Sequence, residues 1–356
     1  MSLPHRYRKD FSPLSLLYRW ISNLQLGRIH RFLTLSLFCM TSPVWAGWIL
    51  SNIPLQKGFT KIPMVSTRTL PKWEIPPPQQ AARMGAFCAQ LKPFFKRHNW
   101  KEDPCGQVAW RTHYHSAQGN PLIYTEFGTG RNTTLFFGGV HPDELTPIQL
   151  SFRLAQHLHD HPEIYRDKDI RIIVAPLINP DGAFVSPPIR TNRTIDVNRN
   201  FLTLDWYEKA HASWQKKNRQ PRFFPGFFPN SEIETHFQIF LMNTYQPTKI
   251  LSMHSPLGFY DYDGPEEDTP APGGTPREFI YTVAKKSNNY KVVNYAIFPG
   301  SLGTFAGYER NVPTITLELE TNDTTKVYAY WKQFFPGFLH SIQHTFSTPT
   351  LSLRKK

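Results

Sequence analysis

The hydrophobic and polar positions of this chain change pattern near residue 110. Downstream, short apolar runs alternate with longer amphipathic stretches. Several runs are apolar on both faces, which is typical of strands in a sheet that helices cover on each side. The predicted strands are 121–128, 134–140, 170–179, 249–254 and 314–319. Helical periodicity predicts helices between them at 147–158, 232–243 and 276–286. The pattern therefore predicts an α/β fold.

The N-terminal segment has a different pattern. Residues 32–50 carry no charge, follow Arg28 and Arg31, and contain Val44-Trp45-Ala46, which is similar to a signal-peptidase site. Residues 1–46 are therefore interpreted as an export signal. The alternative is an uncleaved anchor, because the nineteen residues 32–50 are just long enough to span a bilayer. Under both interpretations we expect the rest of the chain in the periplasm.

Composition divides the remaining chain into segments. Residues 47–80 are rich in proline, which indicates a linker. Residues 81–109 are expected to form a helical capping segment. The catalytic domain is expected over 110–345, with a basic tail at 346–356. Residues 202–229 form a long basic and aromatic loop, for which a solvated role and a substrate-facing role both stay open.

The overall charge narrows the class of partner. The net charge is +13, and removing 1–46, with six Lys/Arg and one Asp, leaves 34 minus 26, or +8. This charge favours anionic surroundings such as a cell wall. The sequence has no long basic run or DNA-reading motif, so we expect no nucleic-acid partner. The sequence makes no prediction of the oligomeric state.

The cysteines are consistent with export. Cys39 lies in the predicted signal, which leaves Cys88 and Cys105. An even number of cysteines in an oxidising compartment predicts a disulfide between them. The alternative is two buried free thiols.

Polar side chains follow the predicted buried strands. His141 and Glu144 come directly after 134–140, and such a pair can converge on one ion where the chain turns out of a strand. A zinc site of two histidines and one carboxylate leaves a position open for water. His254 ends another strand, and Glu318 lies inside 314–319. Because ligands of open α/β folds gather at the carboxyl ends of strands, these groups can meet at one place.

Six short motifs extend this pattern. In chain order they are HPDE (141–144), NPDG (179–182), DVNRNF (196–201), SEIET (231–235), MHS (253–255) and TLEL (316–319). Together they closely resemble the zinc metallocarboxypeptidase family, and within it the murein peptide amidases, over about residues 110–340. The resemblance implies a three-layer α/β/α domain with a mixed, twisted and mainly parallel sheet.

The resemblance also implies roles at the metal site. His141, Glu144 and His254 resemble the ligands of one zinc ion, and Glu318 resembles the general base. Glu320 is the rival base, two residues further on. Asp196 resembles the carboxylate that orients a ligand histidine.

Further residues resemble the family's substrate-binding groups. Asn198 and Arg199 resemble the pair that binds the substrate's terminal carboxylate. Arg190 resembles the arginine that stabilises the oxyanion, with Arg193 as the alternative. Tyr295 lies where the family has its mobile tyrosine. Position 302 or 303 falls near the base of the side-chain pocket and is not acidic, which argues against a preference for Lys or Arg.

The expected function is zinc-dependent hydrolysis of an amide bond next to a free carboxylate. The resemblance implies a cell-wall muropeptide substrate, cleaved at the γ-D-glutamyl–diaminopimelate bond. One alternative is a general carboxypeptidase that removes C-terminal apolar residues from peptides. An alternative of another class is an inactive relative that binds wall peptides, which the complete set of three ligands and Glu318 disfavours.

Overall fold

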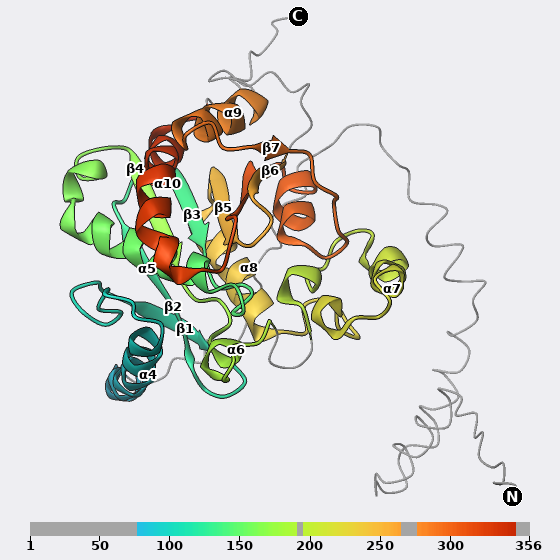
Figure 1. The fold of residues 1–356 in the computed structure, drawn as a ribbon, viewed down its shortest axis with the longest axis horizontal. Coiled ribbons are helices and arrows are strands. Elements are labelled where there is room, and N and C mark those ends of the chain that lie inside the picture. The colour runs from blue at the N-terminus through green and yellow to red at the C-terminus, as the bar shows by residue number, and fades with distance from the viewer. Residues whose placement is uncertain (1–76, 191–194, 265–275, 347–356) are drawn as a thin grey trace, which may run out of the picture. The chain divides into compact units, whose positions relative to one another are not determined.

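A computed structural model describes residues 77–190, 195–264 and 276–346 of the chain (Figure 1). The predicted export signal, its possible membrane tether at 32–50, linker residues 47–76, Arg193 and tail residues 347–356 lie outside this part. Among the described residues, no helix combines the length and apolar character needed to cross a membrane.

A mixed sheet forms the centre of the domain. In the described part of the chain it has eight strands in the order β1-β2-β4-β3-β5-β8-β6-β7. Neighbouring strands from β4 to β8 are parallel, whereas β1, β2 and β6 pair antiparallel with their inner neighbours. The bounds are β1 Arg111–His115, β2 Pro121–Phe127, β3 Asn132–Phe137, β4 Ile170–Ala175, β5 Lys249–His254, β6 Phe259–Asp263, β7 Val292–Val293 and β8 Thr314–Glu318.

Helices cover both faces of the sheet. The helices α5, α9 and α10 pack on one face over a core that includes Phe136, Leu251 and Leu317. Helix α8 packs on the other face through Phe237 and Leu241. The bounds are α4 Pro77–Arg97, α5 Leu145–Asp160, α6 Pro180–Phe184, α7 Trp206–Lys216, α8 Ile233–Tyr245, α9 Pro276–Lys286 and α10 Val327–Gln343. The three-layer α/β/α architecture agrees with the prediction.

The strand order places a binding crevice at β3. From β3 the chain runs through α5 to β4 on one side, whereas β5, reached through α8, pairs with β3 on the other side. Such a reversal opens a crevice beyond the carboxyl ends of the two strands. His141 follows β3 and His254 ends β5. The topology therefore brings the two histidines together from positions 113 residues apart.

Several predicted boundaries need correction. The strand predicted over 134–140 ends at Phe137, because Gly139 adopts a left-handed φ of 58° that turns the chain out of the sheet. The strand predicted over 170–179 ends at Ala175, directly before Pro176, which has no N–H for a ladder. The helix of the capping segment begins at Pro77, so the last four residues of the predicted linker are helical.

The capping segment is attached to the domain by packing and by a disulfide. Phe87, Leu91 and Phe94 of α4 are buried in a third apolar cluster that also contains Phe152 of α5. Cys88 of α4 is joined to Cys105 by the predicted disulfide. The free-thiol alternative is therefore not the one that the structure adopts.

We expect removal of this disulfide to destabilise the domain. The two cysteines are 17 residues apart, and closing a loop of that size stabilises a protein by about 3 kcal/mol in the chain-entropy model. Cys88→Ser together with Cys105→Ser should lower the free energy of unfolding by about that amount, measured by denaturant titration. Non-reducing peptide mapping of the wild type, kept under oxidising conditions, provides the control, and two free thiols there would contradict the prediction.

Candidate active site

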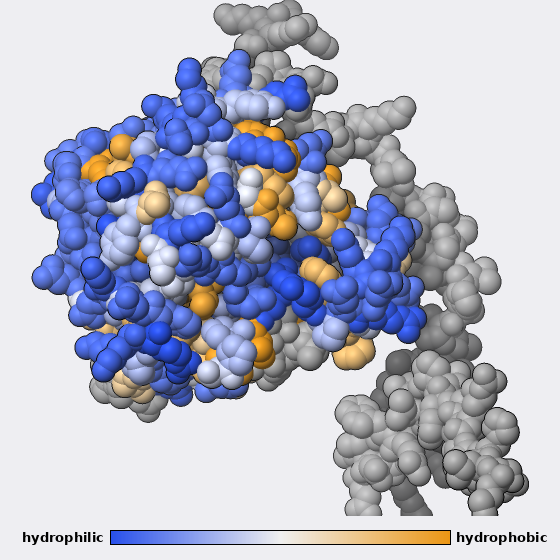
Figure 2. All heavy atoms as spheres, viewed as in Figure 1, coloured by the Kyte–Doolittle hydropathy of each residue, from blue (hydrophilic) through white to orange (hydrophobic). Residues whose placement is uncertain are grey.

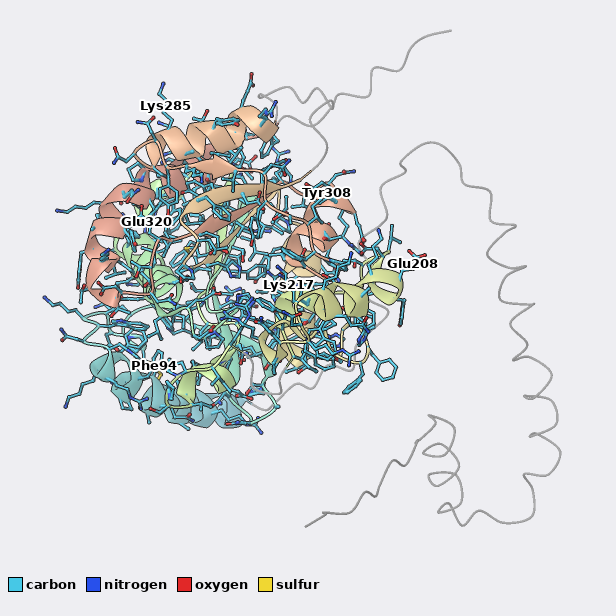
Figure 3. All side chains as sticks on the ribbon, turned by 45° about the vertical axis from the view of Figure 1, so that its right-hand side comes forward. Phe94, Glu208, Lys217, Lys285, Tyr308 and Glu320 are labelled. Carbon is cyan, nitrogen blue, oxygen red and sulfur yellow. A yellow bond between two sulfur atoms is a disulfide. The ribbon has the colours of Figure 1, made fainter. Side chains whose placement is uncertain are left out.

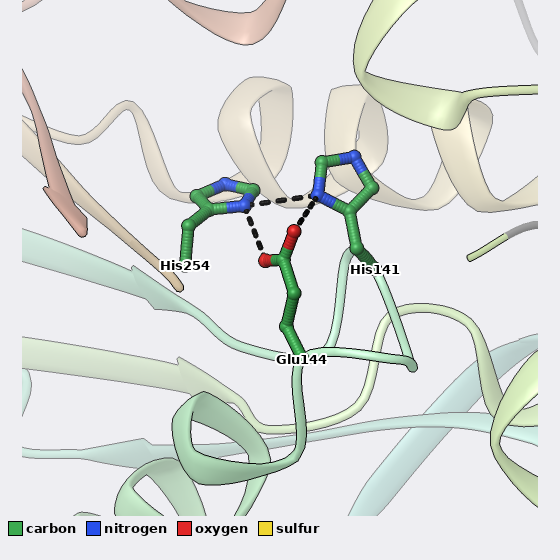
Figure 4. A group of neighbouring side chains, drawn as sticks. All are labelled: His141, Glu144 and His254. Atoms are coloured by element: carbon green, nitrogen blue, oxygen red, sulfur yellow. Dashed lines mark hydrogen bonds and ion pairs between the residues drawn. The ribbon is translucent and has the colours of Figure 1, made fainter. Parts of the chain in front are cut away.

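Three side chains converge at the crevice beyond β3 and β5. His141 Nδ1 lies 2.9 Å from Glu144 Oε1, and His254 Nδ1 lies 3.0 Å from Glu144 Oε2. The two Nδ1 atoms are 3.1 Å apart. All three residues are buried, with exposed fractions of 3–5%. Figure 4 shows both rings turned toward the carboxylate of Glu144, so that three ligand atoms face one point.

The outer nitrogen of each ring has its own partner. His141 Nε2 lies 3.0 Å from Asp196 Oδ1, and His254 Nε2 lies 2.9 Å from Ser252 Oγ. A carboxylate accepts a hydrogen bond from an imidazole N–H, so Asp196 favours the tautomer of His141 with the proton on Nε2. The lone pair of Nδ1 then points toward Glu144. Asp196, the predicted orienting carboxylate, therefore contacts a predicted ligand histidine.

The charges around these atoms fit a bound cation. Burial and the nearby His141 ring lower the pKa of His254 against the pull of Glu144, which favours a neutral ring. Burial opposes ionisation of Glu144, but the two imidazoles lower the pKa of its carboxyl group. Burial and Arg190 oppose protonation of His141, but the carboxylates of Glu144 and Asp196 raise its pKa. A cation near the two Nδ1 atoms, which are 3.1 Å apart, would take the place of a proton there. Two imidazole nitrogens and one carboxylate oxygen are the ligand set of a catalytic zinc site, so the residues fit zinc.

Glu318 lies beside this cluster, and Glu320 does not. Glu318 ends β8, pairs in register with His254 and lines the same cavity. Its Oε2 atom is buried with no hydrogen-bond partner among the described residues. Burial and the charge of Glu144 together raise the pKa of Glu318 to about 8, whereas a bound divalent cation would lower it. Glu320 is exposed and lies outside the cavity, so Glu318 is the carboxylate available as a base.

Arg190 joins the metal cluster to Asp196. Its guanidinium donates to Glu144 Oε1 at 2.8 Å and to Asp196 Oδ2 at 3.1 Å. Burial opposes its protonation, but the carboxylates of Asp196 and Glu144 raise the pKa of Arg190. The guanidinium also lines the cavity beside the predicted ligands. Arg190, the predicted oxyanion-stabilising arginine, therefore lies beside the predicted metal ligands.

Arg199 and Asn198 lie in the cavity wall on the short helix η2, Val197–Arg199. Arg199 donates to the backbone oxygen of Asn198 at 2.6 Å, and its guanidinium lies 4.1 Å from the centre of the Phe298 ring. Among the described residues it forms no ion pair with a carboxylate. Burial lowers the pKa of Arg199, although nearby Asp196 opposes the shift. The Asn198 side chain accepts a hydrogen bond from the Leu302 backbone at 2.8 Å, which fixes its orientation.

Tyr295 lies at the rim of the cavity. Its side chain is 41% exposed, and its ring packs against Phe259 and Phe298. Its backbone N–H donates to Asp261 Oδ1 at 2.9 Å. Tyr295, which the sequence predicts to be the mobile tyrosine, therefore lines the cavity.

The cavity has a volume of about 360 Å³ and includes residues from the 202–229 loop. Trp214, Lys217, Arg222 and Phe223 of this segment line it, which favours the substrate-facing interpretation for part of the loop. Figure 2 shows mainly hydrophilic residues over α7. In Figure 3, Lys217 lies at the end of α7 nearer the centre of the domain, whereas Glu208 points outward.

The structure adds two carboxylates that sequence reasoning missed. Asp261 and Asp263 of β6 line the cavity, so acidic groups do reach the region where the sequence predicted none. They belong to FYDYD at 259–263, where acids alternate with aromatic residues, and strand alternation could have identified them. Their relation to position 303 depends on the pairing of β6 with β8, which the sequence does not reveal.

Comparisons with known proteins agree with this geometry. The zinc carboxypeptidase family matches residues 108–344, about two thirds of the chain. None of the curated proteins compared with the sequence matches it. Bovine thrombin-activatable fibrinolysis inhibitor in complex with tick carboxypeptidase inhibitor is 16% identical. The match covers 73% of this chain and 96% of the other chain, with a TM-score of 0.54.

Two more solved structures are similar. Carboxypeptidase A from Helicoverpa armigera is 15% identical, with 71% of each chain covered and a TM-score of 0.50. The murein-tripeptide amidase MpaA from Escherichia coli O157 is 24% identical, with 66% of this chain and 94% of that chain covered and a TM-score of 0.48. The family match spans the three converging ligands, and the site takes one zinc ion. The chain belongs to the zinc carboxypeptidase family.

Proposed function

We propose that this metallopeptidase hydrolyses the amide bond that precedes a residue with a free carboxylate in cell-wall peptides. The bond we assign is the one between γ-D-glutamate and diaminopimelate. The proposal rests mainly on Arg199. Its guanidinium lines the same cavity as Glu318 and the metal ligands, and it has no carboxylate partner among the described residues. A cation half-buried without a counter-ion is costly, so a substrate carboxylate is the natural partner.

The chemistry can be divided among the residues of the cavity. A zinc ion at His141, Glu144 and His254 supplies a Lewis acid that polarises a carbonyl and lowers the pKa of water. Glu318 accepts a proton from the attacking water through its unpartnered Oε2 and passes it to the leaving amine. Arg190 donates hydrogen bonds toward negative charge that develops on the carbonyl oxygen. Arg199 and Asn198 hold the terminal carboxylate, which fixes the scissile bond relative to Glu318.

Three features favour a wall peptide over an ordinary protein C-terminus. The motifs resemble those of murein peptide amidases. The chain without residues 1–46 carries a charge of +8, which suits an anionic wall, and the expected export would place the enzyme beside it. The cavity also combines cations with the acids Asp261 and Asp263, a lining that suits a small, multiply charged peptide better than an apolar side chain.

Digestion of purified muropeptides tests the proposal. We expect mass spectrometry to detect cleavage between D-glutamate and diaminopimelate. Release of single apolar residues from ordinary peptides, with muropeptides left intact, would contradict the proposal and favour the general carboxypeptidase. Zinc binding without hydrolysis of either substrate would favour the inactive binding module.

Replacing Arg199 by lysine tests the carboxylate contact. Lysine keeps the positive charge but loses the planar fork that binds a carboxylate through two hydrogen bonds. We expect kcat/KM for acyl-γ-D-glutamyl-diaminopimelate to fall by about 1–3 kcal/mol of transition-state stabilisation.

A substrate with an amidated carboxylate is the control for this variant. Wild type should cleave it slowly, and Arg199→Lys should change its rate much less. Equal losses on both substrates would show that Arg199 does not bind the carboxylate.

A further inference from the structure

Three cations surround one aromatic ring in the wall of the cavity. The centre of the Phe223 ring lies 5.4 Å from Arg222 Cζ, 5.7 Å from Arg190 Cζ and 6.0 Å from Lys217 Nζ. All four residues line the cavity that contains the metal ligands and Glu318. Like charges that gather at one place repel each other unless anions accompany them. The partners of these three cations therefore indicate what the cavity can bind.

Two of the three cations have carboxylate partners within the protein. Arg190 donates hydrogen bonds to two carboxylates of the metal site. Arg222 lies 3.7 Å from Asp143. Lys217 contacts ring faces, and among the described residues it forms no ion pair with a carboxylate. Because a ring face attracts a cation but does not neutralise its charge, Lys217 is the cation of this group that is open to an anionic ligand.

Lys217 lies between the surroundings of Arg190 and those of Arg199. Its Nζ is 6.0 Å from the centre of the Phe223 ring and 5.8 Å from the centre of the Phe298 ring. The Phe298 ring is also the one that Arg199 contacts, at 4.1 Å. Figure 3 shows Lys217 at the end of α7 nearer the centre of the domain. The cavity wall therefore offers a second cation for a second negative charge, beside the one assigned to Arg199.

The proposed substrate carries such a charge on the acyl side of its scissile bond. In a γ-linked glutamyl residue the side-chain carboxyl group forms the amide, so the α-carboxylate stays free. Four carbon–carbon bonds separate this carboxylate from the scissile carbonyl carbon, a span of about 5 Å from bonds of about 1.5 Å. The distance from Arg190 Cζ to the centre of the Phe223 ring is similar, at 5.7 Å. A carbonyl oxygen at Arg190 thus brings the α-carboxylate within reach of the cations around Phe223.

We propose that Lys217 is a specificity-determining residue that binds the free α-carboxylate of a γ-linked glutamyl residue. This inference rests on the proposed function, because it takes the scissile carbonyl to lie at Arg190 and the terminal carboxylate at Arg199. The two carboxylates then lie on opposite sides of the scissile bond, and each has its own cation. An ordinary peptide with a neutral residue before the bond satisfies Arg199 alone, so Lys217 favours γ-glutamyl amides over such peptides.

Two substrates that differ by one charge test the inference. The first is acyl-γ-D-glutamyl-diaminopimelate, and the second carries a carboxamide in place of the glutamyl α-carboxylate. The carboxamide keeps the shape of the carboxylate but removes its charge. We expect the zinc-loaded, full-length wild type to cleave the first with about 3- to 10-fold higher kcat/KM, mainly through KM. The preference should shrink in about 1 M salt, because salt screens exposed charges.

Substitutions at two neighbouring lysines assign the effect to one position. Lys217→Gln should bring the ratio of the two kcat/KM values toward one while zinc content stays stoichiometric, and Lys217→Arg, which keeps the charge, should retain most of the preference. Lys216→Gln is the matched control and should keep the wild-type ratio, because Lys216 is exposed at the end of α7 and does not line the cavity.

Two results with these variants would overturn the inference. Equal loss on both substrates in Lys217→Gln would show that Lys217 acts on a group that the substrates share, such as the terminal carboxylate. The same loss of preference in Lys216→Gln and in Lys217→Gln would show a general effect of positive charge.

A binding measurement separates the inference from the proposed function. N-acetyl-D-glutamate and N-acetyl-D-isoglutamine both have a γ-carboxylate, but the α-carboxylate of the second is a carboxamide. Calorimetry with the wild type should detect tighter binding of N-acetyl-D-glutamate, and Lys217→Gln should remove the difference. If γ-D-glutamyl amides are cleaved equally with and without the α-carboxylate, the inference is wrong and the proposed function stands. If no γ-D-glutamyl amide is cleaved, the proposed function is wrong. Binding that depends on Lys217 would then still support the carboxylate subsite, and its absence would overturn the subsite as well.

Discussion

Replacing His254 by alanine is expected to remove the metal ion and the activity together. His254 supplies one of three ligand atoms, and its Nδ1 lies 3.0 Å from the Glu144 carboxylate. Two protein ligands do not complete a catalytic zinc site. We expect zinc content, measured by elemental analysis, to fall from one equivalent to a small fraction. Hydrolysis should fall on the order of 10³-fold or more, since both the Lewis acid and the activated water are lost.

Another histidine provides the matched control. Histidines alternate with other residues at positions 157, 159 and 161, at the end of α5 and directly after it. His161 is exposed, and its Nδ1 lies 3.0 Å from Glu163 Oε1. His161→Ala should retain zinc and activity, because the groups that can hold a metal among the described residues are limited to His141, Glu144 and His254. Stoichiometric zinc in His254→Ala, or loss of zinc in His161→Ala, would contradict the ligand assignment.

The orienting contact explains why the ligand histidines are held so firmly. The Asp196 carboxylate accepts hydrogen bonds from His141 and from Arg190, and it is fully buried. Burial opposes its ionisation, but Arg190 and His141 lower the pKa of Asp196 well below its usual range. An ionised Asp196 keeps the proton of His141 on Nε2, away from the metal position. The metal site thus depends on His141 after β3, on Asp196 directly before η2 and on Arg190 in the segment between them.

The sequence predicted the parts of the site that lie at strand ends. A buried strand is recognised by its apolar run, and β5 and β8 were predicted with bounds within one residue of those observed. The apolar runs alone therefore place His254 at the end of one predicted strand and Glu318 near the end of another. Parallel pairing then places these ends at one edge, so the convergence follows from topology.

Other features depend on tertiary contacts that a sequence pattern does not contain. Helix α10 was not predicted, because its aromatic residues and Pro336 obscure the helical period, although Phe334 and Phe338 are fully buried against the sheet. The place of Asp263 in the cavity wall includes a close contact with Gly303, forty residues away. That contact requires the antiparallel pairing of β6 with β8. Long-range pairing of this kind decides which side chains line the far end of the cavity.

Replacing Glu318 by glutamine is expected to keep the metal and remove most of the turnover. The amide has nearly the same shape as the carboxylate but cannot accept a proton. We expect kcat to fall on the order of 10²-fold or more, which corresponds to about 3 kcal/mol of transition-state stabilisation. Zinc content should stay at one equivalent, because Glu318 is not among the three residues whose ligand atoms converge.

The pH profile separates a base from a merely structural carboxylate. A general base must be ionised, so wild-type kcat/KM should rise with pH through the pKa of Glu318. Burial and Glu144 raise this pKa, and the bound cation opposes them. The acidic limb of the profile should be lost in Glu318→Gln. Glu320→Gln is the control, since that exposed carboxylate lies outside the cavity and should leave both the rate and the limb unchanged. If Glu320→Gln were the damaging change, the base would be two residues further along the chain than the geometry of β8 indicates.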